Sequence, residues 1–429
     1  MTPKNRRPLA AIAKAAAAIV AATVVALAGA TSARADIVRD YEYWLGDYGF
    51  TTAWNTSRGE GVTVAIIDTG VNGNVAELQG VVKGGTDVSG LGTPDGQTPV
   101  GEESSHGTMV ASLLAGRGAG EGAGVIGVAP AADLLTVSVA FGQDTGATKS
   151  NDDQIAEAVV WAVDNGADVI NMSLTRNTRD WPESWDDAFM YAFEHDVVVV
   201  AAAGNRGAGT SEVGAPATIP GVLTVAGVDK AKNASFDASS QGITIGVAAP
   251  SEDLVGVQPD GKYVVWDGTS GAAPLVSGLV ALVRSEYPDL DAANVIERVT
   301  ATADPNGQEV PSSIYGNGLI DPVAALTADV PEIDPDTLVD GLAEWITLHR
   351  RADVDAPDQA AETETPMVVP IADPPLPRSD GAQTLLPTPW TLAYITVPLS
   401  LVAGFGTLAA LLGIGATRHT RRTVRTREQ

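Results

Sequence analysis

Cysteine is absent from this chain of 429 residues, and histidine occurs only four times. Without cysteine, no disulfide bond can stabilise the folded protein. Stability must therefore come from a large hydrophobic core, with or without the help of bound ions. If a histidine carries out acid–base chemistry in this protein, it must be His106, His195, His349 or His419.

Basic residues are also scarce, except at the two ends of the chain. The sequence has 26 lysines and arginines against 53 aspartates and glutamates, a formal charge of −27. Residues 1–35 and 418–429 hold ten of the basic residues and one of the acidic ones, so residues 36–417 keep 16 basic and 52 acidic residues, or −36. Such a surface argues against nucleic acid and anionic lipid as binding partners.

The first 35 residues have the form of a secretory signal peptide. Four basic residues precede an apolar stretch at 15–30, and Ala33-Arg34-Ala35 is a small-x-small cleavage site. The alternative is an N-terminal membrane anchor that is retained. The cleavage site and the preponderance of alanine over leucine in the apolar stretch favour a signal peptide at 1–35.

The C-terminal region predicts a single membrane-spanning helix. Residues 391–417 include no charged side chain, and a helix needs roughly 20 residues to cross the hydrocarbon core. Five arginines follow in the tail at 418–429, so the positive-inside rule places this tail in the cytoplasm and the preceding chain outside. The alternative is a buried core helix. We expect a cell-membrane protein with one span and an extracytoplasmic globular part.

Between these ends, residues 36–328 predict one α/β domain with a short N-terminal extension. Helical spacing occurs at 106–117, 153–165 and 183–194, between short, nearly continuous apolar runs. Alternating strands and helices give a parallel sheet with helices on both faces. The predicted buried strands are at 62–68, 133–140, 168–174, 197–204, 221–228 and 243–249. Residues 329–390 begin with one short amphipathic helix and continue as an acidic, proline-rich stalk.

Four polar residues follow or begin these predicted elements. Asp68 ends the first strand, His106 begins a helix, and Asn205 follows the most apolar strand. Ser270 lies in Gly268-Thr269-Ser270, just before a small-residue apolar helix whose first turn we expect to contain Pro274. Three of these residues have a simpler structural explanation when taken alone: Asp68 as a turn aspartate, Asn205 as a turn asparagine and Ser270 as a helix N-cap serine.

Together, however, the segments around these residues resemble the subtilases, a family of serine proteases. The matching segments stand in the family's order between residues 62 and 278 as IIDTGV, SHGTMVAS, GVAPAADL, VINMSL, VVVAAAGN and DGTSGAAPLVSG. The resemblance implies the subtilisin-like α/β fold, with a parallel sheet and helices on both sides. It also implies the chain order Asp–His–Ser that is known for the catalytic triad of this family.

The resemblance assigns a catalytic role to each of the four residues. Ser270 would be the nucleophile, His106 the general base and Asp68 the group that orients the imidazole. The Asn205 amide would form the oxyanion hole with the main-chain N–H of Ser270, as is known for this family. Activity would then require neutral His106 and would fail in acid.

Substrate recognition is implied for the strand that ends at Ser173-Leu174. In subtilases this strand lines the pocket for the residue before the cut, and two glycines usually follow. Here Thr175 and Arg176 follow, so we expect a narrowed pocket wall and restricted specificity. Arg206 follows Asn205 and would favour an acidic substrate side chain, unless it only solvates the rim. The expected substrate-binding residues are Ser173, Leu174, Thr175 and Arg206.

No cofactor is expected, and no metal site is identified by spacing, although the many carboxylates leave a structural calcium ion open. The order of segments is also similar to that of the mycosins, membrane-anchored subtilases of type VII secretion systems. Mycosins carry disulfide cysteines, and this chain has none. The expected partners are a peptide substrate and the membrane. The alternative is a structural subunit that stabilises a secretion complex, with proteolysis secondary.

Overall fold

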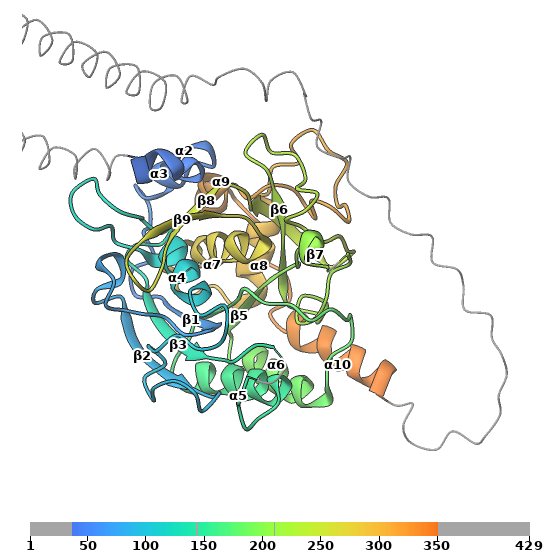
Figure 1. Cartoon of the computed structure of the whole chain (residues 1–429). Helices are drawn as coiled ribbons and strands as arrows, with labels where there is room; N and C mark the ends of the chain where they lie inside the picture. Colours follow the sequence, from blue (N-terminus) through green and yellow to red (C-terminus); the bar gives the residue numbers. More distant parts are fainter. Residues whose placement is uncertain (1–36, 143–144, 210, 351–429) are drawn as a thin grey trace, which may run out of the picture. The chain divides into compact units, whose positions relative to one another are not determined.

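A computed structural model describes residues 37–142, 145–209 and 211–350 of the chain. The predicted signal peptide, membrane-spanning segment and tail lie outside these residues, as does most of the predicted stalk. No helix of the described residues is long and apolar enough to cross a membrane. The compact α/β part of the chain is shown in Figure 1.

Its main element is a seven-stranded sheet in which every neighbouring pair of strands is parallel. The strands follow one another in space in the order β2-β3-β1-β4-β5-β6-β7. Their bounds are β1 Thr63–Asp68, β2 Val82–Asp87, β3 Asp133–Ser138, β4 Val169–Met172, β5 Val198–Ala202, β6 Leu223–Val228 and β7 Ile245–Pro250. A separate antiparallel pair consists of β8 Leu254–Val257 and β9 Tyr263–Trp266.

The structure confirms the six predicted strands. Their apolar runs are buried on both faces of the sheet, which is typical of parallel strands. Strand β2 was not predicted. Its sequence VKGGTD has two glycines and little apolar content, and it lies at the sheet edge with β3 as its single neighbour. The β8–β9 pair was not predicted either; in β9 exposed and half-buried residues alternate.

The strand order changes direction at β1, which pairs with β3 on one side and β4 on the other. In open α/β sheets, ligands bind beyond the carboxyl ends of the strands at such a switch point. Asp68 is the last residue of β1. The chain segments that follow β4 and β5 carry Ser173 and Asn205. Because β1, β4 and β5 are neighbouring parallel strands, the topology brings these two residues and Asp68 to the same carboxyl-terminal end of the sheet.

Helices cover both faces of the sheet (Figure 1). Helices α4 and α7 pack together on one face, while α5 and α6 pack together on the other. Helices α8 and α9 pack against α7, and α10 packs against α6. The bounds of these helices are α4 His106–Ala115, α5 Asn151–Asp164, α6 Glu183–Glu194, α7 Thr269–Glu286, α8 Ala292–Ala301, α9 Pro322–Thr327 and α10 Thr337–His349.

Helix α7 begins two residues earlier than the sequence suggested. Gly268 is the N-cap, and Thr269 and Ser270 are the first two helical residues, so Ser270 is not the cap. Pro274 is therefore the sixth helical residue and lies in the second turn rather than the first. At that position its missing N–H removes the hydrogen bond that would normally reach the carbonyl of Ser270.

The segment before β1 is anchored on the domain. It contains the short helices α2 Tyr43–Asp47 and α3 Phe50–Ala53, and Trp44 and Phe50 are fully buried. The hydroxyl of Tyr43 donates to the carbonyl of Glu252, and the indole N–H of Trp54 donates to the carbonyl of Val128. These contacts pack the N-terminal segment on the domain.

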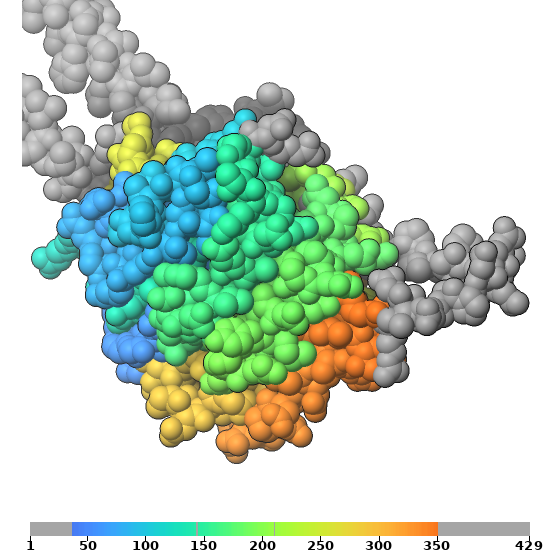
Figure 2. All heavy atoms as spheres, turned by 90° about the horizontal axis from the view of Figure 1, so that it is seen from below, coloured from blue at the N-terminus to red at the C-terminus, as the bar shows by residue number. Residues whose placement is uncertain are grey.

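Helix α10 belongs with the α/β unit, although the sequence predicts that the stalk begins at residue 329. The Trp345 ring stacks on Trp181 with centroids 4.1 Å apart, and Leu342 is fully buried. Arg350 donates to both carboxylate oxygens of Asp186 in α6. Figure 2 shows the orange segment that holds α10 beside the green segment that holds α6.

Candidate active site

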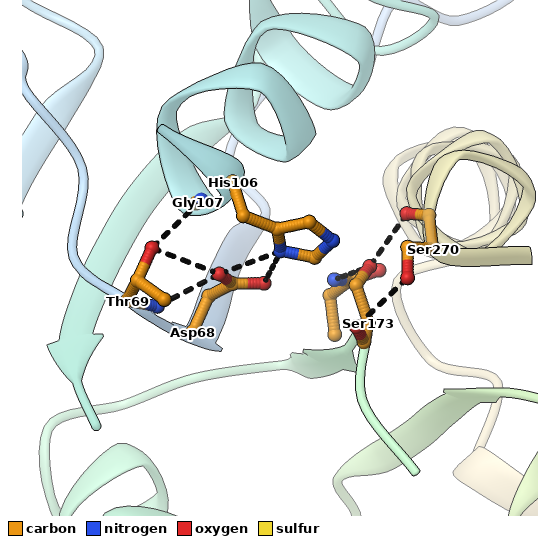
Figure 3. A network of polar contacts seen from close by, with 7 residues as sticks. Asp68, Thr69, His106, Gly107, Ser173 and Ser270 are labelled. Atoms are coloured by element: carbon orange, nitrogen blue, oxygen red, sulfur yellow. Dashed lines mark hydrogen bonds and ion pairs between the residues drawn. The ribbon is translucent and has the colours of Figure 1, made fainter. Parts of the chain in front are cut away.

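Asp68 and His106 form a directly bonded pair at the end of β1. The Nδ1 atom of His106 lies 2.8 Å from Oδ1 and 2.9 Å from Oδ2 of Asp68, which is 1% exposed (Figure 3). The main-chain N–H of Thr69 donates to Asp68 Oδ1 at 2.7 Å, and the Thr69 hydroxyl accepts from the N–H of Gly107 at 3.0 Å. A buried carboxylate needs such partners, and together they hold the first turn of α4 against β1.

Gly107 lets α4 approach β1 this closely. A Cβ atom at this position would lie 2.5 Å from the carbonyl oxygen of Gly70 and 3.2 Å from Asp68 Cβ and Oδ1. Any other residue would therefore push the helix, and with it His106, away from Asp68. The glycine in the SHGT motif thus sets the distance between the two side chains.

The charge state of His106 depends on the carboxylates around it. Burial alone lowers the pKa of His106, but the charge of Asp68 and its hydrogen bond raise it, and the charge of Glu103 raises it further. The carboxylates outweigh burial, so the pKa of His106 lies above its ordinary value. His106 is thereby a stronger base than an isolated imidazole.

Trp266 packs edge to face against the imidazole. The ring centroids of Trp266 and His106 are 5.7 Å apart, with an angle of 72° between the planes. Trp266 is the last residue of β9. The benzene edge of its indole also packs on α7, 3.4 Å from the place that a Cβ atom on Gly271 would take. The Trp266 side chain therefore contacts both His106, at the start of α4, and Gly271 of α7. The sequence did not reveal this contact, because it depends on the β8–β9 pair.

Ser270 lies across the cleft from His106, on the first turn of α7. Its hydroxyl donates to the main-chain carbonyl of Ser173 at 3.1 Å rather than to Nε2 of His106. In Figure 3 the side of the imidazole remote from Asp68 faces Ser173 and Ser270. The structure therefore forms the Asp–His contact of a triad and leaves the Ser–His contact unmade. Catalytic hydrogen bonds are often loose before substrate binds.

A chain of buried side-chain hydrogen bonds holds the Ser270 main chain. The hydroxyl of Ser277 donates to Asn171 Oδ1 at 2.8 Å, and Asn171 Nδ2 donates to the Ser173 hydroxyl at 3.0 Å. The Ser173 hydroxyl in turn donates to the carbonyl of Ser270 at 2.8 Å. That carbonyl is available because Pro274 has no N–H to offer it. Ser173 thus replaces the helical bond and ties α7 to β4.

Asn205 is oriented by the start of α7. Its Oδ1 accepts from the main-chain N–H of Thr269 at 2.8 Å and from the Thr269 hydroxyl at 2.9 Å. The same hydroxyl accepts from the N–H of Gly204 at 3.0 Å. Since the oxygen is used in these bonds, the Nδ2 group is turned the other way. A Cβ atom on Gly268, whose φ is +146°, would lie 2.9 Å from this Nδ2, so only glycine fits there.

A cleft of about 390 Å³ opens between His106 and Ser270. The residues that line it come from the chain directly after β1, from the segment that leads into α4 and the first residue of α4, from the chain after β3 and β4, and from α7. They are Thr69, Gly101, Glu102, Glu103, His106, Phe141, Gly142, Ser173, Leu174, Thr175 and Ser270. Of the expected substrate-binding residues, Ser173, Leu174 and Thr175 line the cleft.

The two arginines that the sequence associates with the cleft lie elsewhere. Arg206 belongs to the short 3-10 helix η2 Arg206–Ala208, and its guanidinium lies over the ring of Phe236, 5.3 Å from the centroid. Arg176 is paired with Asp152 and lies over the ring of Trp185. Neither side chain lines the cleft, and the preference for acidic substrates through Arg206 stays a prediction.

Glu102 and Glu103, which were not predicted as site residues, line the cleft beside His106. Their proximity to the SHGT motif along the chain was a signal that could have identified them. Within residues 37–350, in the ranges that the structure describes, no group of three or more His, Cys, Asp or Glu side chains is placed to hold a metal ion. A structural calcium site therefore remains an open prediction.

Comparison with known proteins agrees with this geometry. A sequence profile described as the subtilase family matches residues 59–318, which is more than half of the chain. The chain belongs to the subtilase family. It is 37% identical to mycosin-3 of Mycobacterium tuberculosis over 334 residues, covering 65% of this chain and 70% of that protein. It is 38% identical to subtilisin DY of Bacillus licheniformis over 272 residues, covering 62% and 92% of the two chains.

Solved structures support the same assignment. The MycP3 protease from the type VII (ESX-3) secretion system has a TM-score of 0.56 at 36% identity, over 66% of this chain and 87% of that chain. MycP1 from Mycobacterium smegmatis has a TM-score of 0.57 at 32% identity, over 68% and 86% of the chains. This subtilase is therefore mycosin-like, with a subtilisin-like α/β fold. It is a serine endopeptidase of peptidase family S8.

Proposed function

We propose that this subtilase cleaves extracytoplasmic polypeptides through a triad of Asp68, His106 and Ser270. One observation carries the assignment of the triad. A buried carboxylate holds the Nδ1 side of the single histidine that lines the cleft, and Ser270 lines the same cleft. A carboxylate in that position fixes the imidazole tautomer, so that Nε2 is the basic nitrogen and faces the nucleophile.

The reaction begins when the hydroxyl of Ser270 leaves the carbonyl of Ser173 and donates to His106 Nε2. Oγ then attacks the scissile carbonyl carbon while His106 takes the proton, and Asp68 stabilises the imidazolium. His106 next gives that proton to the leaving amine, and water hydrolyses the acyl-enzyme by the same proton path in reverse.

The negative charge on the substrate oxygen would be held by two donors. They are the Nδ2 group of Asn205 and the main-chain N–H of Ser270, the second residue of α7. Support comes from the Thr269 contacts that fix the Asn205 amide, and from the unsatisfied N–H groups and the dipole at the start of α7. Because both donors are oriented before substrate binds, little reorganisation accompanies the reaction.

Substrate would lie along the main chain at 173–175, with restricted specificity. Thr175 lines the cleft and stands where subtilases usually have glycine, so its side chain would narrow the wall. Beyond Thr175, two ion pairs join Arg176 to Asp152 and Lys149 to Glu157, and both acidic partners lie on α5. Charged residues here would favour selected sequences over general digestion.

The proposed location is the cell membrane. A signal peptide at 1–35, a span at 391–417 and a cytoplasmic tail at 418–429 would place the catalytic unit outside the membrane. Residues 351–390 would connect α10 to the span. These segments are proposed from the sequence alone.

A second function is suggested by the similarity to the MycP3 and MycP1 proteases, whose structures are described as parts of type VII secretion systems. Here the chain would stabilise a membrane complex as a structural subunit, and proteolysis would be secondary. In cells, Ser270→Ala separates the two functions. A variant that retains full secretion favours the structural role, whereas loss of function at unchanged protein level favours proteolysis.

Fluorophosphonate labelling of the full-length protein tests the active site itself. We expect the label on the wild-type protein and its loss in Ser270→Ala. Ser285→Ala is the matched control, because Ser285 lies on the same helix and its hydroxyl donates to the carbonyl of Glu60. Labelling that survives in Ser270→Ala, or its absence from the wild-type protein, would overturn the proposed active site.

A further inference from the structure

Two glutamates form one wall of the cleft, directly before α4. Glu102 and Glu103 line the cleft together with His106 and Ser270, and both glutamates are exposed. Neither carboxylate forms a hydrogen bond or an ion pair with another described residue. Among the described residues, the one charge interaction recorded for this pair is that of Glu103 with His106.

The rest of the cleft lining offers them no cation. Apart from His106, the other lining residues have no ionisable side chain. Two basic residues that lie close to lining residues in the sequence already have partners: Arg176 pairs with Asp152, and Lys149 pairs with Glu157. The cleft is therefore acidic on the His106 side and neutral on the opposite side, at 173–175.

A bound peptide removes water from this wall. Two carboxylates that lose their water without gaining a partner raise the free energy of the complex. A cation supplied by the ligand offsets this cost. An acidic ligand side chain would add like-charge repulsion. The wall therefore distinguishes substrates by the sign of the side chain that lies against it.

We propose that Glu102 and Glu103 make this protease selective for substrates with a lysine or arginine side chain beside the scissile bond, on the His106 side of the cleft. The inference rests on the proposed function, because it requires Ser270 to be the nucleophile in this cleft. The proposed preference is opposite in sign to the acidic preference that the sequence predicts through Arg206.

Glu103 contributes most to this selectivity. Its charge is one of those that raise the pKa of His106, so its carboxylate acts on the place where the scissile bond must lie. Glu102 adds a second negative charge to the same wall. An arginine or lysine side chain is long enough to reach carboxylates at the rim while its stem lies along the cleft.

The strongly acidic composition of the chain requires a charge-matched control. A net charge of −27 attracts any basic peptide from a distance, whatever the cleft contains. Glu309 and Glu332 are exposed, lie outside the cleft lining and form no side-chain bond with another described residue. Replacing both by glutamine changes the net charge as much as replacing Glu102 and Glu103 does.

The test compares kcat/KM for three full-length proteins: wild type, Glu102→Gln/Glu103→Gln and the control Glu309→Gln/Glu332→Gln. The substrates are quenched fluorescent peptides in which each position around the cut is in turn Lys, Arg, Gln or Glu. Mass spectrometry identifies the cleaved bond. We expect wild type and control to prefer Lys or Arg over Gln by about fivefold at one position, and the cleft variant to lose that preference.

Labelling of Ser270 by a fluorophosphonate separates the possible failures. If Ser270 is labelled but wild type cleaves Lys and Gln peptides equally, or the cleft variant keeps the preference, the inference is overturned and the proposed function stands. If the control loses the preference as well, it comes from net charge and not from Glu102 and Glu103. If Ser270 is not labelled, the proposed function and the inference both fail.

Discussion

The hydroxyl of Ser173 donates a hydrogen bond of 2.8 Å to the carbonyl oxygen of Ser270, although 97 positions separate the two residues in the chain. This carbonyl would normally accept the N–H of the residue four positions later in α7, which is Pro274 and has none. Because Pro274 leaves this carbonyl free, Ser173 can connect the helix that carries the proposed nucleophile to the chain that lines the cleft.

Replacing Ser173 by alanine should weaken both stability and catalysis. The change leaves Asn171 Nδ2 without its buried acceptor, so we expect the free energy of unfolding to fall by about 1–3 kcal/mol. The Ser270 carbonyl also loses its anchor, which should lower kcat several-fold and change KM less. Denaturant unfolding and steady-state kinetics measure the two effects.

The Pro274→Ala background tests the reason for this contact. There the new main-chain N–H at position 274 can donate to the Ser270 carbonyl, as in an ordinary helix. We expect Ser173→Ala to lower kcat less in this background than in the wild-type chain. An equal loss in both backgrounds would show that Pro274 does not determine the role of Ser173.

The acid limb of the pH profile should lie above the ordinary pKa of histidine. Only neutral His106 can accept the serine proton, so kcat/KM rises with pH through its raised pKa. Glu103→Gln removes one of the charges that raise this pKa, so the limb should move to lower pH. Glu309→Gln should leave it in place. An unchanged limb in Glu103→Gln would exclude this electrostatic effect.

Asn205→Ala should reduce kcat by about 100- to 1,000-fold with little change in KM. The magnitude is the one known for the side-chain oxyanion donor of subtilisin, a member of the same family. The substitution also removes the acceptor of the Thr269 N–H. Asn205→Asp keeps that acceptor but has no N–H donor, so it should restore stability without restoring kcat. Recovery of kcat in Asn205→Asp would contradict the proposed oxyanion role.

Helix α10 should contribute to the stability of the catalytic unit. Leu342→Ala removes a fully buried side chain next to the Trp345–Trp181 stack, and we expect a loss of about 2–4 kcal/mol in unfolding free energy. Leu348, on the same helix, is 64% exposed, so Leu348→Ala should change stability by less than about 0.5 kcal/mol. Equal effects in thermal unfolding would indicate that α10 does not stabilise the unit.

Much of the fold could be predicted because buried parallel strands are continuously apolar and the covering helices have regular spacing. The predicted run at 197–204 became β5 Val198–Ala202, and the predicted helix at 183–194 became α6 Glu183–Glu194. Strand β2 escaped prediction because Gly84 and Gly85 lack side chains that could form an apolar pattern. Helix α10 was predicted as a helix, but its packing on α6 was not, since an apolar stripe does not name the surface that it covers.

For the site, the chain order of Asp68, His106, Asn205 and Ser270 was enough to indicate the family and the proposed chemistry. The sequence by itself determined these residue types and their places at strand and helix ends, because both depend on local composition and spacing. Only the tertiary structure decided where each side chain points. It turned Arg206 toward Phe236, put Glu103 in the cleft and paired Ser270 with Ser173. Those directions depend on packing between segments that are distant in the chain, which local patterns do not specify.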